Sequence, residues 1–68
     1  MFSLDCTGLS CPIPVVKTKK ALKENPEGMD VLVDNVAAME NVSRFAEKMG
    51  YNAAVVEMDG AWKIEIRR

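Results

Sequence analysis

The chain has 68 residues, and its nine Lys and Arg side chains against ten Asp and Glu side chains give a net charge of −1. This near-neutral balance implies no general affinity for nucleic acid. No stretch approaches the ~18 apolar residues of a membrane span, and the N-terminus lacks the basic and apolar regions of a signal peptide. We therefore expect one domain over residues 1–68, located in the reducing cytoplasm and not bound to a membrane.

The ligand chemistry of the chain is narrow. Histidine is absent, which removes the commonest transition-metal ligand and the usual general base. The two cysteines, Cys6 and Cys11, give a zinc site too few soft ligands on their own. The sequence therefore predicts no metal site and no cofactor.

A short strand followed by a glycine-containing loop is the first predicted element. Phe2, Leu4 and Cys6 alternate with polar residues, so these three side chains share one face of the strand. Cys6 is accordingly expected in the core and not in the chemistry. Gly8 serves the tight loop, and Leu9 is expected to fill the space beneath it.

The helix that follows is predicted to begin at Cys11 and to end near Lys23 or Glu24. Pro12 and Pro14 fit its first turn, because the N–H group that proline lacks would have no partner there. Cys11 then falls at the N-cap, where unpaired backbone N–H groups and the helix dipole favour thiolate. A buried, inert thiol is the alternative for any cysteine, but this position favours Cys11 as a nucleophile.

Lysines crowd this first helix. Its apolar stripe is expected to comprise Val15, Thr18, Ala21 and Leu22. The lysines are Lys17, Lys19, Lys20 and Lys23, against Glu24 alone. They form either a solvated helix face or a docking patch for an acidic partner beside the candidate nucleophile. In the second interpretation Ile13, Lys17 and Lys20 are the candidate docking residues.

The middle of the chain predicts a strand and a second helix. The turn residues 25–28 end the first helix, and 29–33 form a largely apolar and therefore central strand. Asp34 and Asn35 are expected to cap the second helix, and Gly50 to end it. The apolar positions at helical spacing are expected to face the core, and they are Ala38, Met39, Val42, Phe45, Ala46 and Met49.

The C-terminal third predicts a hairpin of strands 53–58 and 61–67. Asp59-Gly60 is a strong two-residue turn signal, and it places Val55 opposite Ile64. The resulting order, β-α-β-α-β-β, predicts an α+β fold. Its architecture is a two-layer α/β sandwich, with two helices packed on one face of a four-stranded mixed sheet.

The region around Cys11 resembles the Cys-Pro-x-Pro motif of the TusA/SirA/YedF family of small sulfur carriers. The matching motif is Asp5-x-x-Gly8-Leu9-x-Cys11-Pro12-x-Pro14. The closest branch is YedF, on the segments Val33-Asp34-Asn35, Glu40-Asn41-Val42, Phe45-Ala46 and Gly50-Tyr51. Ile13 stands between the prolines where well-known carriers have a charged residue.

The resemblance implies the same two-layer fold and a sulfur carrier with sulfurtransferase-like chemistry in sulfur or selenium metabolism. Cys11 would accept sulfur as a persulfide and pass it on. Asp5, Gly8, Leu9, Pro12 and Pro14 would shape its site. The expected partners are a cysteine desulfurase or another sulfur donor, and a downstream acceptor of the DsrE-like kind. A small carrier that docks on larger partners is expected to be a monomer.

Two other functions fit the same residues. The first is a thiol–disulfide switch in which Cys6 resolves an oxidised Cys11, which requires their Cα atoms to lie within about 7 Å. The second is a non-catalytic binding module, since this architecture also hosts RNA binding. Base stacking needs exposed aromatic side chains beside basic ones, and this chain has few aromatic residues.

Overall fold

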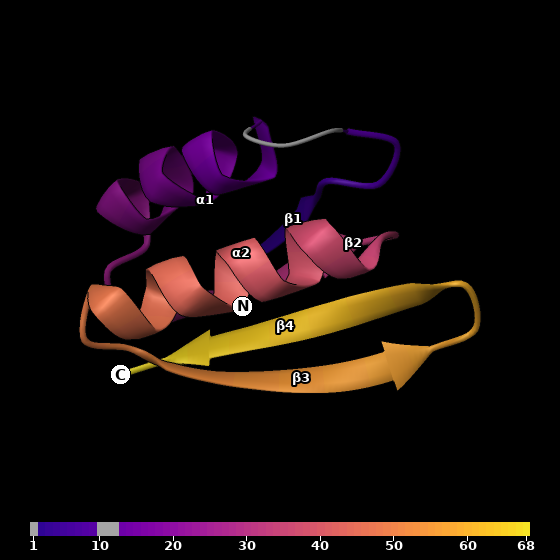
Figure 1. Ribbon diagram of the computed structural model, residues 1–68. Coiled ribbons are helices and arrows are strands. Elements are labelled where there is room, and N and C mark those ends of the chain that lie inside the picture. The colour runs from indigo at the N-terminus through magenta and orange to yellow at the C-terminus, as the bar shows by residue number, and fades with distance from the viewer. Residues whose placement is uncertain (1, 10–12) are drawn as a thin grey trace.

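The computed structural model describes residues 2–9 and 13–68, so the expected helix start at Cys11 and Pro12 lies outside the described residues. The elements in chain order are β1 (Ser3–Asp5), α1 (Ile13–Glu24), β2 (Gly28–Val33), α2 (Val36–Lys48), β3 (Asn52–Met58) and β4 (Ala61–Arg67) (Figure 1). This order confirms the predicted α+β fold. Neither helix in the described part of the chain is long and apolar enough to span a membrane.

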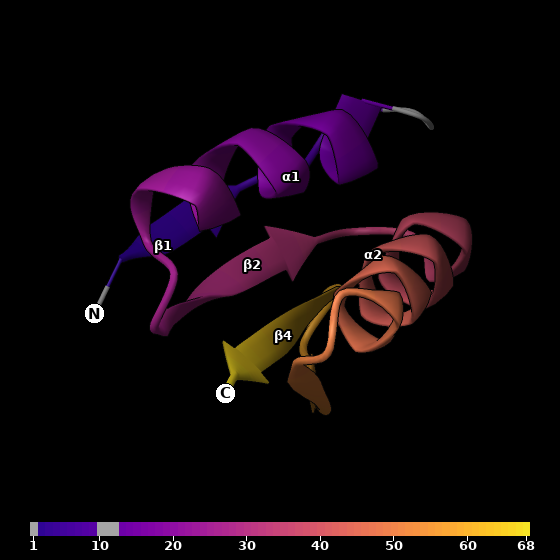
Figure 2. The same ribbon diagram turned by 90° about the vertical axis from the view of Figure 1, so that its left-hand side faces the viewer.

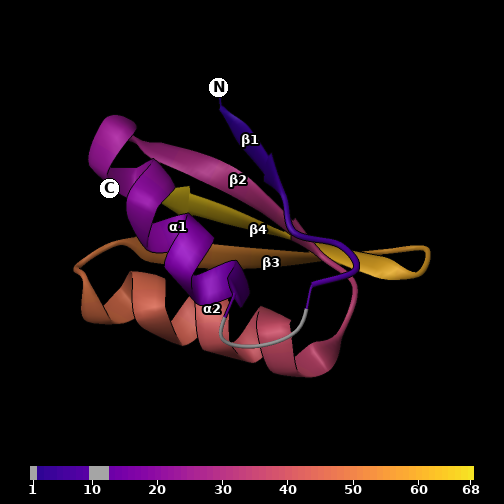
Figure 3. The same cartoon turned by 90° about the horizontal axis from the view of Figure 1, so that it is seen from above.

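The four strands form one mixed sheet in the order β1-β2-β4-β3. β1 pairs with β2 in parallel, with Leu4 opposite Val31, and the other two pairings are antiparallel. Both helices cover the same face of this sheet, as Figures 2 and 3 show. The central position of β2 explains its apolar sequence, since a strand between two neighbours and under a helix layer excludes water.

The hairpin of β3 and β4 has the predicted register, with Val55 opposite Ile64 and Glu57 opposite Trp62. Because side chains alternate along a strand, Ile64 and Ile66 share the helix-covered face, and both are fully buried. Lys63 and Glu65 lie on the opposite face, where they form an ion pair of 3.3 Å. The two-residue turn and the alternation of apolar residues are therefore sufficient to specify this part of the sheet.

The second helix is capped at both ends. Asn35 is its N-cap, and the side-chain oxygen of Asn35 accepts a hydrogen bond of 2.8 Å from the Ala38 N–H. At the other end the Gly50 N–H donates to the Glu47 carbonyl and the Tyr51 N–H to the Ala46 carbonyl, a Schellman arrangement. The prediction that Gly50 ends the helix is thus confirmed.

Met49 corrects the predicted inner face of this helix. It is 56% exposed, because the helix ends at Lys48 and Met49 is the C-cap. The apolar residues at helical spacing therefore extend to Met49, although the last of them that is buried is Ala46. The buried residues of α2 are Ala38, Val42 and Ala46, while Met39 and Phe45 pack at the margin of the core.

The core lies between the helix layer and the sheet. Its buried apolar members are Cys6, Leu22, Met29, Val31, Val33, Ala38, Val42, Ala46, Ile64 and Ile66. Burying one large aliphatic side chain stabilises a fold by about 1.5–3 kcal/mol. The buried Thr18 hydroxyl donates to the Pro14 carbonyl at 2.7 Å, so it adds no unpaired polar group. On the predicted stripe of α1, Thr18 and Leu22 are buried, whereas Val15 and Ala21 are half-buried.

Candidate functional site

The loops that flank the motif meet at one end of the sheet. β1 and β2 run in parallel, so the loops that follow them leave from the same end of the sheet, the one at which both strands have their carboxyl ends. β4 begins at this end too, because Val33, the last residue of β2, pairs with Trp62 near the start of β4. Figure 3 shows the hairpin tip and the start of α2 at this end. Cys11 and Pro12 lie outside the described residues, and the site is therefore described from Leu9 and Ile13 outward.

Asp5 turns the chain at the end of β1. Its Oδ1 atom accepts hydrogen bonds from the Thr7 backbone N–H at 2.9 Å and from the Thr7 hydroxyl at 2.7 Å. This is the local turn that short acidic side chains form with the backbone two residues later. The two bonds favour the charged carboxylate, and the pKa of Asp5 is lowered, first by the Thr7 hydroxyl and then by the Thr7 N–H.

Asp34 holds the loop after β1 from across the sheet edge. Its Oδ2 atom accepts a hydrogen bond of 2.9 Å from the Gly8 N–H. The sequence placed Asp34 with Asn35 as a helix cap, but Asn35 alone has that role. Leu9 is half-buried and packs against the core, as predicted. Gly8 and Leu9 are therefore held by one long-range hydrogen bond and one apolar contact.

Cys6 is a core residue. Its side chain is 0% exposed, and its backbone N–H donates to the Leu32 carbonyl at 2.7 Å. Burial raises the pKa of the Cys6 thiol, an effect that the charge of Lys17 partly opposes and that of Asp5 reinforces. A protonated and enclosed thiol is a poor nucleophile. The burial of Cys6 and its raised pKa thus disfavour Cys6 as the resolving thiol of a thiol–disulfide switch.

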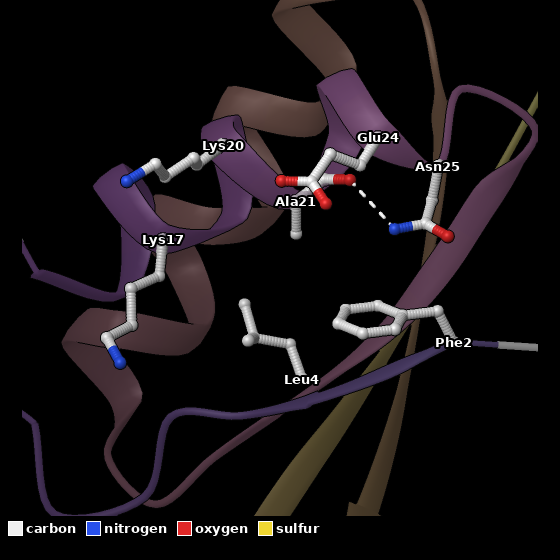
Figure 4. A pocket seen from close by; sticks show the side chains of 7 residues that line it. All are labelled: Phe2, Leu4, Lys17, Lys20, Ala21, Glu24 and Asn25. Atoms are coloured by element: carbon white, nitrogen blue, oxygen red, sulfur yellow. Dashed lines mark hydrogen bonds between the residues drawn. The ribbon is translucent and has the colours of Figure 1, made fainter.

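The first two turns of α1 divide the remaining predicted residues. Pro14 is buried and Ile13 is 43% exposed. Lys17 and Lys20 are exposed and line a groove of about 300 Å³ between α1 and β1 (Figure 4). Ile13 is not among the residues that line this groove. The structure therefore joins the two predicted docking lysines in one groove, which Ile13 does not share.

The Asp5 turn makes the stability of the protein pH-dependent at the acidic end. Because the pKa of Asp5 is lower in the folded protein than the ordinary 3.8, its turn contributes stability above pH 3.8. That contribution is lost as the pH falls through the lower, folded value. In an NMR titration of the Asp5 carboxyl carbon, Thr7→Val should move the midpoint up toward 3.8. Thr7→Ser keeps the hydroxyl and should leave the midpoint low, and an unmoved midpoint in Thr7→Val would contradict this assignment.

Comparison with known proteins places this chain in a family. A family model described as sulfurtransferase TusA matches residues 2–68. The chain is 45% identical over 71 residues to a protein of Methanocaldococcus jannaschii named as a candidate sulfur carrier, with 100% of this chain and 95% of that protein covered. A protein of Thermotoga maritima with a similar name is 33% identical over 69 residues, with 96% and 87% covered.

A solved structure agrees with the sequence relatives. The crystal structure of a SirA-like protein from Desulfitobacterium hafniense superposes with a TM-score of 0.89 at 41% identity. The superposition covers 98% of this chain and 96% of that chain. The two helices and the four-stranded mixed sheet are thus a shared architecture. The chain belongs to the TusA/SirA-like family of sulfur carriers.

Proposed function

We propose that this protein accepts sulfur as a persulfide on Cys11 and relays it to a partner protein. The observation that carries the proposal is the TusA match over residues 2–68, together with relatives named as candidate sulfur carriers. The environment of Cys6 supports the assignment to Cys11, because the chain has two cysteines and Cys6 is fully buried. Residues 1–68 would act as one TusA-like domain of the YedF type in the cytoplasm.

The proposed transfer consists of two sulfur exchanges. The Cys11 thiolate attacks the terminal sulfur of a donor persulfide, a new S–S bond forms on Cys11, and the donor leaves as its thiolate. An acceptor thiolate then attacks the outer sulfur on Cys11 and releases the Cys11 thiolate. Each step breaks one S–S bond and forms another, so no external oxidant or reductant is consumed. A cysteine desulfurase is the proposed donor class, and a DsrE-like protein is the proposed acceptor class.

The surroundings of the motif have defined parts in this proposal. Asp5 and Asp34 hold the loop before Cys11 through the hydrogen bonds to Thr7 and Gly8. Leu9 and Pro14 anchor the chain on either side of residues 10–12, since one packs on the core and the other is buried. The proposed site thus places a reactive sulfur between two fixed points of the scaffold.

Partner docking would use the exposed residues at the start of α1. Ile13 is 43% exposed and would offer a partner an apolar side chain within the motif. Lys17 and Lys20 follow on the same helix and would attract an acidic partner surface. The partner would also supply proton transfer, because the chain has no histidine to act as a general base.

The test is to load the protein from a desulfurase and free cysteine, and then to measure its intact mass. We expect a species heavier by roughly 32 Da, one sulfur atom, that dithiothreitol removes. Peptide mapping of an alkylated sample should locate the added sulfur on Cys11. Absence of the heavier species, or its location on Cys6, would contradict the proposal. A loss of about 2 Da under mild oxidant, with Cys6 and Cys11 linked, would instead identify the thiol–disulfide switch.

A further inference from the structure

β1 presents an unpaired backbone edge. The Phe2 carbonyl accepts from the Asp30 N–H at 2.9 Å, and the Cys6 N–H donates to the Leu32 carbonyl at 2.7 Å. In a trans peptide the C=O and N–H groups point in opposite directions, so the Ser3 N–H and the Asp5 carbonyl point away from β2. β1 is also the first strand in the sheet order. No strand lies beyond it among residues 2–9 and 13–68.

A groove runs beside this edge on the helix side of the sheet. Its apolar surface comes from Phe2, which precedes β1, from Leu4 on β1 and from Ala21 on α1. Phe2 is 44% exposed, although it lies on the same strand face as the core residue Cys6. In Figure 4 the side chains of Phe2 and Leu4 lie side by side between the strand and the helix. Apolar side chains of an added strand would find unfilled contact area there.

The two ends of the groove differ in charge. Lys17 and Lys20 lie toward the Leu4 end, whereas Glu24 and Asn25 lie toward the Phe2 end (Figure 4). The Asn25 side-chain amide donates to the Ala21 carbonyl at 3.0 Å, which fixes it beside the helix. A negatively charged group is therefore attracted to the Leu4 end and repelled by Glu24 at the other. This asymmetry gives a bound chain a preferred direction.

We propose that the edge of β1 and this groove bind an extended acidic segment of a partner protein, which adds to the sheet as a fifth strand. The backbone of the segment would pair with the Ser3 N–H and the Asp5 carbonyl, a recognised mode of peptide capture. Its side chains would enter the groove at every second position, about 6.6–6.8 Å apart. The matching pattern is a carboxylate next to Lys17 and Lys20 and, two residues along, an apolar side chain on Phe2.

This inference deepens the proposed docking of a partner on Lys17 and Lys20 and names the chemistry of that partner. Its test contains no sulfur transfer and uses the Cys11→Ala protein, so its failure is distinguishable from failure of the relay. The probe is a fluorescein-labelled peptide in which threonine alternates with Glu, Leu and Val. The readouts are fluorescence anisotropy and the amide shifts of the protein by NMR. We expect saturable binding, with shifts at residues 3–5 and 17–21.

Charge-reversal variants test the side-chain half of the proposal. Lys17→Glu/Lys20→Glu should weaken peptide binding by on the order of tenfold, about 1.4 kcal/mol. Lys19→Glu/Lys23→Glu is the matched control, because it makes the same change on the same helix outside this groove. Those two lysines line a separate hollow with Leu22 and Phe45. Equal weakening by both double variants would show that only net charge matters and would overturn the proposal.

A proline variant tests the backbone half. Ser3→Pro removes the N–H that points to the free edge and leaves the bonds between β1 and β2 intact, since proline is tolerated on edge strands. We expect the thermal transition to persist and peptide binding to weaken at least tenfold. Unchanged binding in Ser3→Pro would overturn strand addition. Concentration-dependent self-association of the protein alone, with the same amide shifts, would assign the edge to a second copy and overturn the partner.

Discussion

Cys11→Ser is expected to reduce sulfur relay to the background of the assay while the fold persists. A serine hydroxyl is not a thiolate and cannot carry sulfur through an exchange of S–S bonds. Cys6 cannot replace it, because the Cys6 thiol is 0% exposed and burial raises its pKa. The measurement is the transfer of radiolabelled sulfur from a loaded desulfurase to a small acceptor thiol, with and without the protein.

Cys6→Ala is the control for this prediction. It removes the other thiol of the chain but should retain the relay, since Cys6 belongs to the core and not to the proposed site. The small void left in the core should cost about 1 kcal/mol of unfolding free energy. A Cys11→Ser protein that still relays sulfur above background would refute the assignment of the carrier thiol. So would a Cys6→Ala protein that folds but no longer relays.

Gly28→Ala is expected to be the most destabilising single-methyl change in the chain. An added Cβ would lie 2.3 Å from the Ile66 carbonyl oxygen, and the backbone φ of Gly28 is +125°, which side-chain-bearing residues rarely adopt. β2 cannot move away, because Gly28 pairs with Arg67 on the neighbouring strand. We expect a loss of at least about 3 kcal/mol. That is a large part of the ~3–10 kcal/mol usual for this length.

Gly60→Ala is the matched control for Gly28→Ala. Gly60 also has a positive φ, +76°, but nothing lies within 4 Å of the position of an added Cβ. Only the conformational penalty remains, about 1–2 kcal/mol. Thermal unfolding followed by circular dichroism should show that the Tm of Gly28→Ala is lower than that of the unchanged protein by about 12–24 °C or more. If the two variants unfold at the same temperature, the steric contact with Ile66 is not the cause.

Elements with a local signal could be predicted from the sequence. Asp59-Gly60 and the alternation around it give the hairpin register, because a two-residue turn leaves one pairing that buries Ile64 and Ile66 together. The end of α2 at Gly50 follows equally from chain-local bonding. The prediction that Met49 faces the core was wrong, because helical spacing gives the periodicity of the apolar residues but not the residue at which contact with the sheet ends. Gly28 was expected as a turn residue, yet it is the first residue of β2, and a side chain is excluded there because the Ile66 carbonyl of β4 lies too close.

The candidate site divides in the same way. The family could be expected from the Cys-Pro-x-Pro motif, because its residues lie close together in the sequence, and the family model that matches residues 2–68 shows the family independently. The bond from Gly8 to Asp34 spans 26 positions, and no local pattern encodes it. The groove beside Lys17 and Lys20 likewise depends on how α1 lies over β1. The assignment of this chain to the YedF branch of the family stays a prediction.

The hydrogen bond from the Gly8 N–H to the Asp34 carboxylate must break before the loop after β1 can move away from the start of α2. A protein that draws this loop away must break the bond from the Gly8 N–H to Asp34, and because the bond is exposed, water or an acceptor on the partner can replace the carboxylate. A partner that leaves the bond intact meets Thr7 and Gly8 already held by Asp5 and Asp34. Binding partners should therefore fall into two kinds, those that leave the Gly8–Asp34 bond in place and those that break it, and the Asp34→Ala variant should affect only the first kind.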